Sequence, residues 1–323
     1  MSINSKLPLI ILTGPTGVGK TELSIKLAKE LDGEIISADS IQVYKYMDIG
    51  SAKIMPDEMQ GVEHHLINFL EPDEEFNIFL FKEYAKAAMD KIYAKGKIPI
   101  IAGGTGFYIQ SVLYDIEFNI EEDENKEVRS KYMELAKEHG NAYVHKLLEE
   151  IDPESAATIH ANNLKRVIRA IEYYEHSGEK ISEHNKREAK KTSPYDFHYF
   201  VLNRNRDVLY QRINDRVDIM IKNGLVDEVR KLLDMGYSRD LTSMQGIGYK
   251  EIVEYLEDEI TLEEAIQKIK LDTRHFAKRQ LTWFRREKTV TMLNYEDFDD
   301  NTDTICEYII KKVKNIKNYN TKK

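Results

Sequence analysis

The sequence predicts an α/β fold whose core is a P-loop NTPase-like parallel sheet flanked by helices, with a mostly helical insertion domain. The first observation is the octapeptide GPTGVGKT, which follows an apolar run at residues 7–12 and precedes an amphipathic stretch at residues 22–28. A buried strand, a glycine loop and a helix in this order are the context that a phosphate-binding P-loop requires. The second observation is a charged, strandless helical block from about residue 116, after which strand patterns resume near residue 198.

Composition limits the classes of protein that this chain can be. Its 323 residues indicate about two domains, and 41% hydrophobic with 32% charged residues is typical of a soluble globular protein. No apolar run approaches the roughly 20 residues of a membrane span, and residues 1–7 lack a signal-peptide core, so we expect a cytoplasmic protein without a membrane partner. The single cysteine, Cys306, excludes an internal disulfide and a cysteine-rich zinc site. A net charge of −9 argues mildly against nucleic-acid binding, although only the distribution of charge can decide this.

The octapeptide predicts a phosphate or diphosphate site and leaves open whether the phosphates belong to a nucleotide. Its glycines let consecutive backbone N–H groups turn inward, and the following helix N-terminus adds positive potential. Lys20 supplies a charge to phosphate oxygens, and the Thr21 hydroxyl is placed to bind Mg²⁺. The predicted phosphate-binding residues are Gly14, Pro15, Thr16, Gly17, Val18, Gly19, Lys20 and Thr21.

A second strand is predicted at residues 34–39, where it ends in Asp39. Ligands in open α/β sheets bind beyond the carboxyl ends of the strands, so Asp39 is expected in the same crevice as the P-loop. The alternative is that Asp39 caps a turn, because Asp-Ser is good capping chemistry. After a polar and aromatic loop at residues 40–53, a third strand is predicted at residues 64–70; its adjacent histidines face opposite ways and favour no metal site.

The next elements are a helix at residues 79–93, a strand at residues 97–102 and a second glycine turn, GGTG, at residues 103–106. This turn either forms a second wall of the crevice or allows close helix packing. We divide the chain into a first core segment (1–115), the helical insertion (116–195) and a second core segment (196–323). The insertion begins with an acidic run at residues 121–124 and carries the cations Lys165, Arg166 and Arg169.

After a strand at residues 198–202, a helix is predicted at residues 207–222. Arg212 and Arg216 are four residues apart and share one face of it. They either reach back to the phosphates or form surface ion pairs with Asp215 or Asp218.

A helix at residues 249–256 precedes a long helix at residues 262–288, where a seven-residue spacing of Ile269, Phe276 and Trp283 predicts a buried seam. Residues 268–288 hold eight lysines or arginines and two acidic residues, a local charge of +6 that indicates a polyanion-binding surface. A short strand (290–293) and a helix (304–317) complete the chain. The cations on the face opposite the seam are Lys270, Arg274, Lys278 and Arg285.

Six motifs in this order resemble the bacterial tRNA dimethylallyltransferase family. They are GPTGVGKT, SADSIQVYKYMDIGSAK, IAGGTGFYIQ, NLKRVIRAIE, QGIGYKEI and TRHFAKRQLTWFRRE, and the similarity covers residues 7–288. The resemblance implies transfer of a dimethylallyl group from dimethylallyl diphosphate to the exocyclic amine of the adenosine 3′-adjacent to the tRNA anticodon, with Mg²⁺ as cofactor. It also implies that the helical insertion and the basic helix bind the anticodon stem-loop, and we expect a monomer.

The resemblance assigns roles to individual residues. Asp39 is implied as the general base, with Thr16 and Arg216 as diphosphate contacts; Arg212 remains an alternative to Arg216. The implied tRNA-binding residues are Asp39, Ser40, Ile41, Gln42, Thr105, Arg129, Lys165, Arg166, Val167, Ile168 and Arg169, to which the charge pattern adds Arg274 and Lys278.

Three other functions fit parts of the sequence. A small-molecule or nucleotide kinase shares the P-loop spacing, but we find no phosphoacceptor site or arginine-rich lid for it. A prenyltransferase acting on free adenine nucleotides would lack a use for the basic helix. An RNA-binding module with a vestigial P-loop would not depend on Asp39.

Overall fold

The computed structural model describes residues 6–117, 125–287 and 289–313, which belong to two compact units. The first unit comprises Met1–Leu113 and Pro194–Lys323, and the second comprises Tyr114–Ser193. The second unit therefore occupies the segment in which the sequence predicts a helical insertion. The acidic run at residues 121–124 lies outside the described residues.

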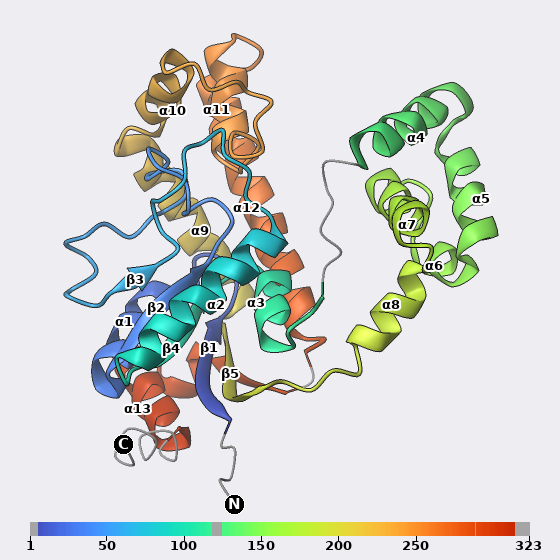
Figure 1. Ribbon diagram of the computed structural model, residues 1–323. Helices are drawn as coiled ribbons and strands as arrows, with labels where there is room; N and C mark the ends of the chain where they lie inside the picture. Colours follow the sequence, from blue (N-terminus) through green and yellow to red (C-terminus); the bar gives the residue numbers. More distant parts are fainter. Residues whose placement is uncertain (1–5, 118–124, 288, 314–323) are drawn as a thin grey trace, which may run out of the picture. The chain divides into compact units, whose positions relative to one another are not determined.

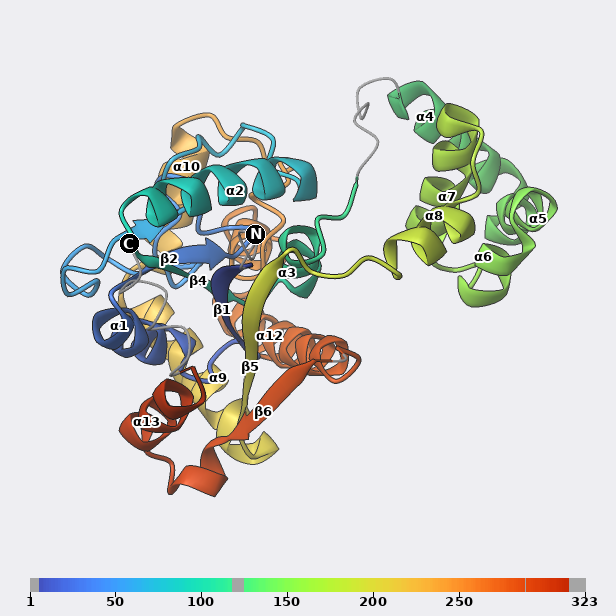
Figure 2. The ribbon, with the colours of Figure 1, turned by 60° about the horizontal axis from the view of Figure 1, so that its bottom comes forward.

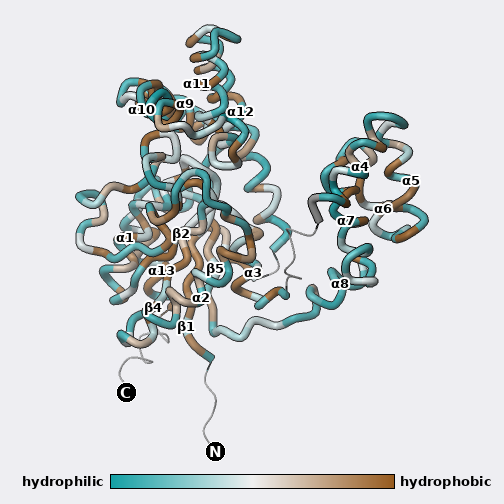
Figure 3. Tube along the Cα trace, turned by 45° about the horizontal axis from the view of Figure 1, so that its top comes forward, coloured by the Kyte–Doolittle hydropathy of each residue, from teal (hydrophilic) through white to brown (hydrophobic). Residues whose placement is uncertain are grey.

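Six parallel strands form the centre of the first unit, in the order β3-β2-β4-β1-β5-β6 (Figure 1). Figure 3 shows hydrophobic residues along β1, β2, β4 and β5. Strands β1, β2 and β4 are almost entirely buried, as expected where helices cover both faces of a parallel sheet. The strands are β1 (Leu7–Thr13), β2 (Gly33–Ala38), β3 (His64–His65), β4 (Ile98–Gly103), β5 (Tyr195–Asn203) and β6 (Val290–Asn294).

Helices cover the two faces of this sheet. Helices α1 (Lys20–Leu31) and α13 (Thr302–Lys312) pack together on one face, and α2 (Ile78–Ala94) and α3 (Gly106–Leu113) on the other (Figure 2). The P-loop lies between β1 and α1. A group of four further helices follows β5: α9 (Arg206–Lys222), α10 (Leu225–Asp234), α11 (Tyr249–Leu256) and α12 (Leu262–Phe284).

The third strand is much shorter than its apolar pattern predicts. Leu66 and Asn68 adopt left-handed conformations with φ of 62° and 58°, and β3 ends after two residues because of them. The chain then turns to pair with the loop after β2, where the Asn68 N–H donates to the Gln42 carbonyl at 2.9 Å and the Lys45 N–H to the Leu70 carbonyl at 2.7 Å. The prediction of a regular strand over residues 64–70 was wrong because backbone strain at two positions overrides the hydrophobic pattern.

The second unit is a bundle of short helices with its own core. Its buried side chains include Val144, Leu148, Val167, Ile168 and Ile171. Within the described residues of both units, no helix has the length and apolar character needed to cross a membrane. The helices of this unit are α4 (Asn125–His139), α5 (Asn141–Ile151), α6 (Pro153–Thr158), α7 (Leu164–Ser177) and α8 (Ile181–Glu188).

Candidate active site

The P-loop adopts a conformation that depends on its glycines. Gly17 and Gly19 have φ of 81° and 114°, in the left-handed region that side chains disfavour. A Cβ atom at Gly14 would lie 2.6 Å from the Leu202 carbonyl oxygen, and one at Gly19 would lie 2.7 Å from the Tyr295 hydroxyl. The loop is therefore packed tightly against the sheet and leads directly into the N-terminus of α1, which favours an anion.

Lys20 lies over this loop and is strongly perturbed. Its Nζ donates to the carbonyl oxygens of Gly14 and Pro15, both at 2.9 Å. The pKa of Lys20 is lowered to about 7, mainly by burial and also by the charge of Arg216, while Asp39 acts in the opposite direction. Burial destabilises the charged form of the Lys20 ammonium group. A bound anion would stabilise that form, because its charge compensates the lost hydration.

The two arginines of α9 have different surroundings. Arg212 Nε donates to the Gly17 carbonyl at 2.9 Å, so this guanidinium braces the P-loop. Burial and the neighbouring Arg212 lower the pKa of Arg216. In the described part of the chain, Arg216 has no hydrogen-bond or ion-pair partner. Asp215 instead accepts from Gln211, and Asp218 pairs with Lys270. The surface ion pairs offered as an alternative for these arginines are thus absent among the described residues.

Asp39 follows the last residue of β2 and is only partly buried. One carboxylate oxygen, Oδ1, accepts from the backbone N–H groups of Ile41 at 2.9 Å and Gln42 at 3.2 Å. The second oxygen, Oδ2, has no hydrogen-bond partner among the residues that the structure describes. Asp39 therefore caps a turn with one oxygen and keeps the other available, so the capping interpretation and the chemical one are compatible.

A cavity of about 70 Å³ connects these charged groups with an apolar wall. Lys20, Thr21 and Asp39 line its polar part. Such a cavity suits a small molecule with an anionic and a hydrocarbon end. Its other lining residues include Ser24, Ser37, Gln42, His64 and the apolar Ile35, Ile54, Ile67 and Ala102.

The loop after Asp39 is held by long-range contacts. Gln42 Oε1 accepts from the Ser37 hydroxyl at 3.1 Å, and its Nε2 donates to the carbonyls of Ser51 and Ala52. Both ends of the Gln42 amide therefore form hydrogen bonds within the protein. Glu228 of α10 accepts from three successive backbone N–H groups, at residues 48–50. Sequence reasoning missed Glu228, because an acid about 180 residues away gives no local signal for a loop anchor.

The second glycine turn is a docking surface for α12. A Cβ at Gly104 would lie 2.1 Å from Gln280 Nε2, and one at Gly106 would lie 2.2 Å from Trp283 Cδ1. The close-packing interpretation of this turn is therefore correct, and Gly103 also lines the cavity, so the turn contributes to its wall as well. The turn also lies beside the end of β2, since the Thr105 N–H donates to the Ala38 carbonyl at 3.2 Å.

Helix α12 buries a different set of side chains from the one that the seven-residue spacing predicts. Ile269 is buried, but Phe276 is 37% exposed and Trp283 is only partly buried. The buried face is centred closer to Ala277 and Phe284, so Phe276 and Trp283 lie at its edge. The helix also ends at Phe284, four residues before the predicted boundary.

The cations of α12 divide into paired and unpaired groups. Lys268 pairs with Glu254 at 2.6 Å and Lys270 with Asp218 at 2.6 Å. Arg274 contacts the neutral Asn214 side chain at 3.2 Å. Lys278 and Arg285 have no acidic partner within the described residues, which leaves their charge available.

The second unit holds the remaining sequence-predicted residues. Arg129 forms a two-pronged contact with the buried Glu172, at 2.9 and 3.1 Å. Val167 and Ile168 are 0% and 2% exposed, so their side chains pack in the core of this unit. Three cations on the same helix, α7, have no hydrogen-bond or ion-pair partner in the described structure: Lys165, Arg166 and Arg169.

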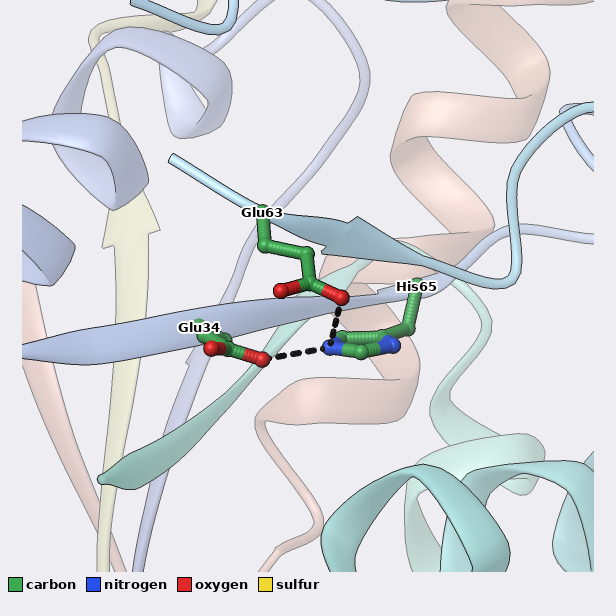
Figure 4. A group of neighbouring side chains, drawn as sticks. All are labelled: Glu34, Glu63 and His65. Carbon is green, nitrogen blue, oxygen red and sulfur yellow. Dashed lines mark hydrogen bonds and ion pairs between the residues drawn. The ribbon is translucent and has the colours of Figure 1, made fainter. Parts of the chain in front are cut away.

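A group of potential metal ligands lies at the opposite end of β2 from Asp39. Glu34, Glu63 and His65 present ligand atoms that all lie within 4.8 Å of one another (Figure 4). Sequence reasoning missed this group because Glu34 comes from another strand. Lys95 and Lys97 also contact Glu34, at 3.0 and 3.1 Å, so we interpret the group as an ion-pair network rather than a metal centre.

We expect Glu34→Gln to lower the free energy of unfolding at pH 7 by roughly 2 kcal/mol. Burial alone would raise the pKa of Glu34, but hydrogen bonds from His65, Lys95 and Lys97 outweigh it and hold the pKa at about 2, below its usual 4.5. The stabilisation is present above pH 4.5 and is lost as pH falls towards 2. Denaturant unfolding between pH 2 and 7 measures this; equal pH dependence in both proteins would refute it.

Comparison with known families adds independent information. The family model for IPP transferase matches residues 42–287, and the model for isopentenyl transferase matches residues 7–72. The chain is 56% identical over 302 residues to a tRNA dimethylallyltransferase of Lachnoclostridium phytofermentans, covering 94% of this chain and 96% of the relative. It is 52% identical over 312 residues to the enzyme of the same name from Clostridioides difficile, covering 96% and 99%.

Solved structures give the same result. A tRNA isopentenylpyrophosphate transferase from Staphylococcus epidermidis is 44% identical with a TM-score of 0.71. The match covers 96% of this chain and 100% of that structure's chain. A crystallographically studied eukaryotic dimethylallyltransferase acting on tRNA is 31% identical with a TM-score of 0.79, with 94% and 78% covered. The P-loop core, the family models and these relatives agree: the chain belongs to the IPP transferase family, that of the tRNA dimethylallyltransferases.

Proposed function

We propose that the protein transfers the dimethylallyl group of dimethylallyl diphosphate to the exocyclic amine of the adenosine 3′-adjacent to the tRNA anticodon. The reaction takes place in the crevice that contains the cavity beside the P-loop. The observation that carries this proposal is a cavity whose lining combines Lys20 and Asp39 with an apolar wall. A phosphoryl transferase needs no hydrocarbon pocket beside its phosphate cradle, whereas a prenyl donor does. The names of the relatives agree with this chemistry.

In this reaction the carbon–oxygen bond of the donor breaks and a nitrogen–carbon bond forms at the adenine amine. The electron pair of the broken bond goes to diphosphate, whose growing charge needs positive groups already in place. Backbone N–H groups of the P-loop, Lys20 and Arg216 provide them, and we assign the Thr16 hydroxyl as a further donor. A bound anion would offset the burial and the charge of Arg216 that lower the pKa of Lys20.

The amine loses a proton as the new bond forms, and Asp39 is the group that accepts it. Its free Oδ2 is the acceptor, while Oδ1 holds the carboxylate in place through the turn at residues 41–42. The Thr21 hydroxyl lies in the same cavity, and a hydroxyl with phosphate oxygens is an oxygen-donor set that suits Mg²⁺. That ion would neutralise part of the charge on diphosphate.

The target adenosine must leave the stacked anticodon loop to enter the crevice, as base-modifying enzymes require. The loop at residues 39–42 contributes Asp39 and Gln42 to the lining of the cavity, and the Thr105 N–H donates to the carbonyl of Ala38, next to Asp39. Arg274 and Lys278 of α12, which have no acidic partner in the described structure, bind RNA phosphates, as do Lys165, Arg166 and Arg169 of α7. Within that α7 segment the buried Val167 and Ile168 support the helix, and Arg129 does the same through Glu172.

We expect Lys278→Ala to weaken binding of an anticodon stem-loop and to reduce the slope of log Kd against log salt by about 1. Lys278 has no acidic partner in the described structure, so its contact with phosphate releases counterions. Lys268→Ala on the same helix is the matched control, because Lys268 is already paired with Glu254. Fluorescence anisotropy at several salt concentrations measures both. Equal slopes in the two variants would argue against this RNA surface.

A direct assay of acceptor choice tests the function. The chain is incubated with radiolabelled dimethylallyl diphosphate and either an anticodon stem-loop or AMP. We expect label in the stem-loop only. Label in AMP would make the chain a nucleotide prenyltransferase, and phosphate transfer from ATP without prenyl transfer would make it a kinase.

A further inference from the structure

Gln280 of α12 joins the two glycine loops of the crevice. Its Oε1 accepts the backbone N–H of Thr16 in the P-loop at 2.9 Å, and its Nε2 donates to the Gly104 carbonyl in the turn after β4 at 3.0 Å. The residue is 6% exposed, so both hydrogen bonds are shielded from water. A buried amide that uses both of its ends in this way holds two loops at a fixed separation.

The glycines of the turn after β4 leave room for the Gln280 side chain. Any side chain at Gly104 would collide with Gln280, because its Cβ would lie 2.1 Å from Nε2. One helical turn further along α12, Trp283 occupies the space beside Gly106 in the same way. The two glycines of this turn therefore provide the room for two side chains of one helix.

We propose that Gln280 is a positioning residue for dimethylallyl transfer. It fixes the Thr16 peptide, and with it the P-loop, relative to the turn after β4, where Gly103 lines the cavity. The Thr16 N–H donates to Gln280 and is therefore not available to the diphosphate. This hydrogen bond instead orients Thr16, whose hydroxyl contacts the leaving group. This inference rests on the proposed function, because it assigns Gln280 to the same reaction.

The role makes a kinetic prediction. Without the amide, the Thr16 N–H and the Gly104 carbonyl lose their buried partner, and the P-loop no longer has a fixed distance to the acceptor. Ground-state binding of diphosphate depends mainly on the other loop N–H groups and on Lys20, so it should change little. The alignment of leaving group and amine is what suffers, and misalignment acts on kcat.

The test compares Gln280→Met with Gln267→Met. Methionine has a similar length and no amide; Gln267 lies on the exposed face of the same helix, where it contacts Glu263. For Gln280→Met we expect kcat to fall on the order of 10- to 100-fold, with the KM of dimethylallyl diphosphate within about threefold. Gln267→Met should match the unchanged chain. Calorimetric titration with inorganic diphosphate gives the fraction of protein that is folded and competent to bind.

A second variant keeps the test decisive. Gln280→Leu also removes both hydrogen bonds and keeps an apolar side chain of comparable size, so we expect the same loss of kcat as for Gln280→Met. The inference is overturned if kcat of Gln280→Met stays within about twofold, if kcat falls only in proportion to the binding-competent fraction, or if Gln280→Leu retains the kcat that Gln280→Met loses. If the unchanged chain transfers no dimethylallyl group to tRNA, the proposed function fails instead.

Discussion

Replacing Asp39 by Asn should lower kcat for dimethylallyl transfer on the order of 10²- to 10⁴-fold. Asparagine keeps a side-chain oxygen, which still accepts from the backbone N–H groups of Ile41 and Gln42 and preserves the turn. The substitution removes the basic Oδ2, which has no partner in the described structure, and places an amide there instead. Single-turnover transfer to an anticodon stem-loop measures the loss.

Binding measurements separate this loss from a change of structure. The affinities for inorganic diphosphate and for the stem-loop should stay within about threefold of those of the unchanged chain, because neither depends on the proton acceptor. Transfer by Asp39→Asn at a rate within about tenfold of the unchanged chain would exclude Asp39 as the base.

Replacing Arg216 by Gln should lower kcat on the order of 10²- to 10³-fold. Arg216 is a guanidinium with a lowered pKa and no partner among the described residues, so its charge is available to diphosphate. The effect should be larger on kcat than on the affinity for inorganic diphosphate, since charge on the leaving group grows in the transition state. Steady-state kinetics with saturating stem-loop gives both parameters.

Arg212→Gln is the matched control on the same helix. Its Nε already donates to the Gly17 carbonyl, so we expect a loss of about tenfold or less through the loop that it braces. A larger loss for Arg212→Gln than for Arg216→Gln would reverse the two assignments. Equal, small effects would remove both arginines from the leaving-group site.

The sequence predicted those features that depend on short stretches of chain. The P-loop follows from glycine spacing between an apolar run and a helix, and Asp39 is placed by the rule that parallel strands end at one edge of the sheet. The local charge of α12 was also visible, because cations repeat along one segment. The arrangement of six parallel strands agrees with this reading.

Features that depend on distant partners were not predictable. Gln280 and Glu228 act on loops that lie 264 and about 180 residues away in the chain, so no local pattern marks them. The same applies to the pairing of Lys268 and Lys270, which removes two cations from the predicted basic surface. The third strand and the position of Phe276 were misjudged because hydrophobic pattern alone does not report left-handed residues or the edge of a packed face.

Nucleoside mass spectrometry of tRNA tests the central claim most directly. Unmodified tRNA is incubated with the chain, dimethylallyl diphosphate and Mg²⁺, then digested to nucleosides. The account predicts one adenosine per tRNA carrying a single dimethylallyl group on its exocyclic amine, located next to the anticodon by fragment mapping, and far less product with Asp39→Asn after the same short incubation. Unmodified adenosine after incubation with the unchanged chain, or modification at scattered adenosines, would contradict it.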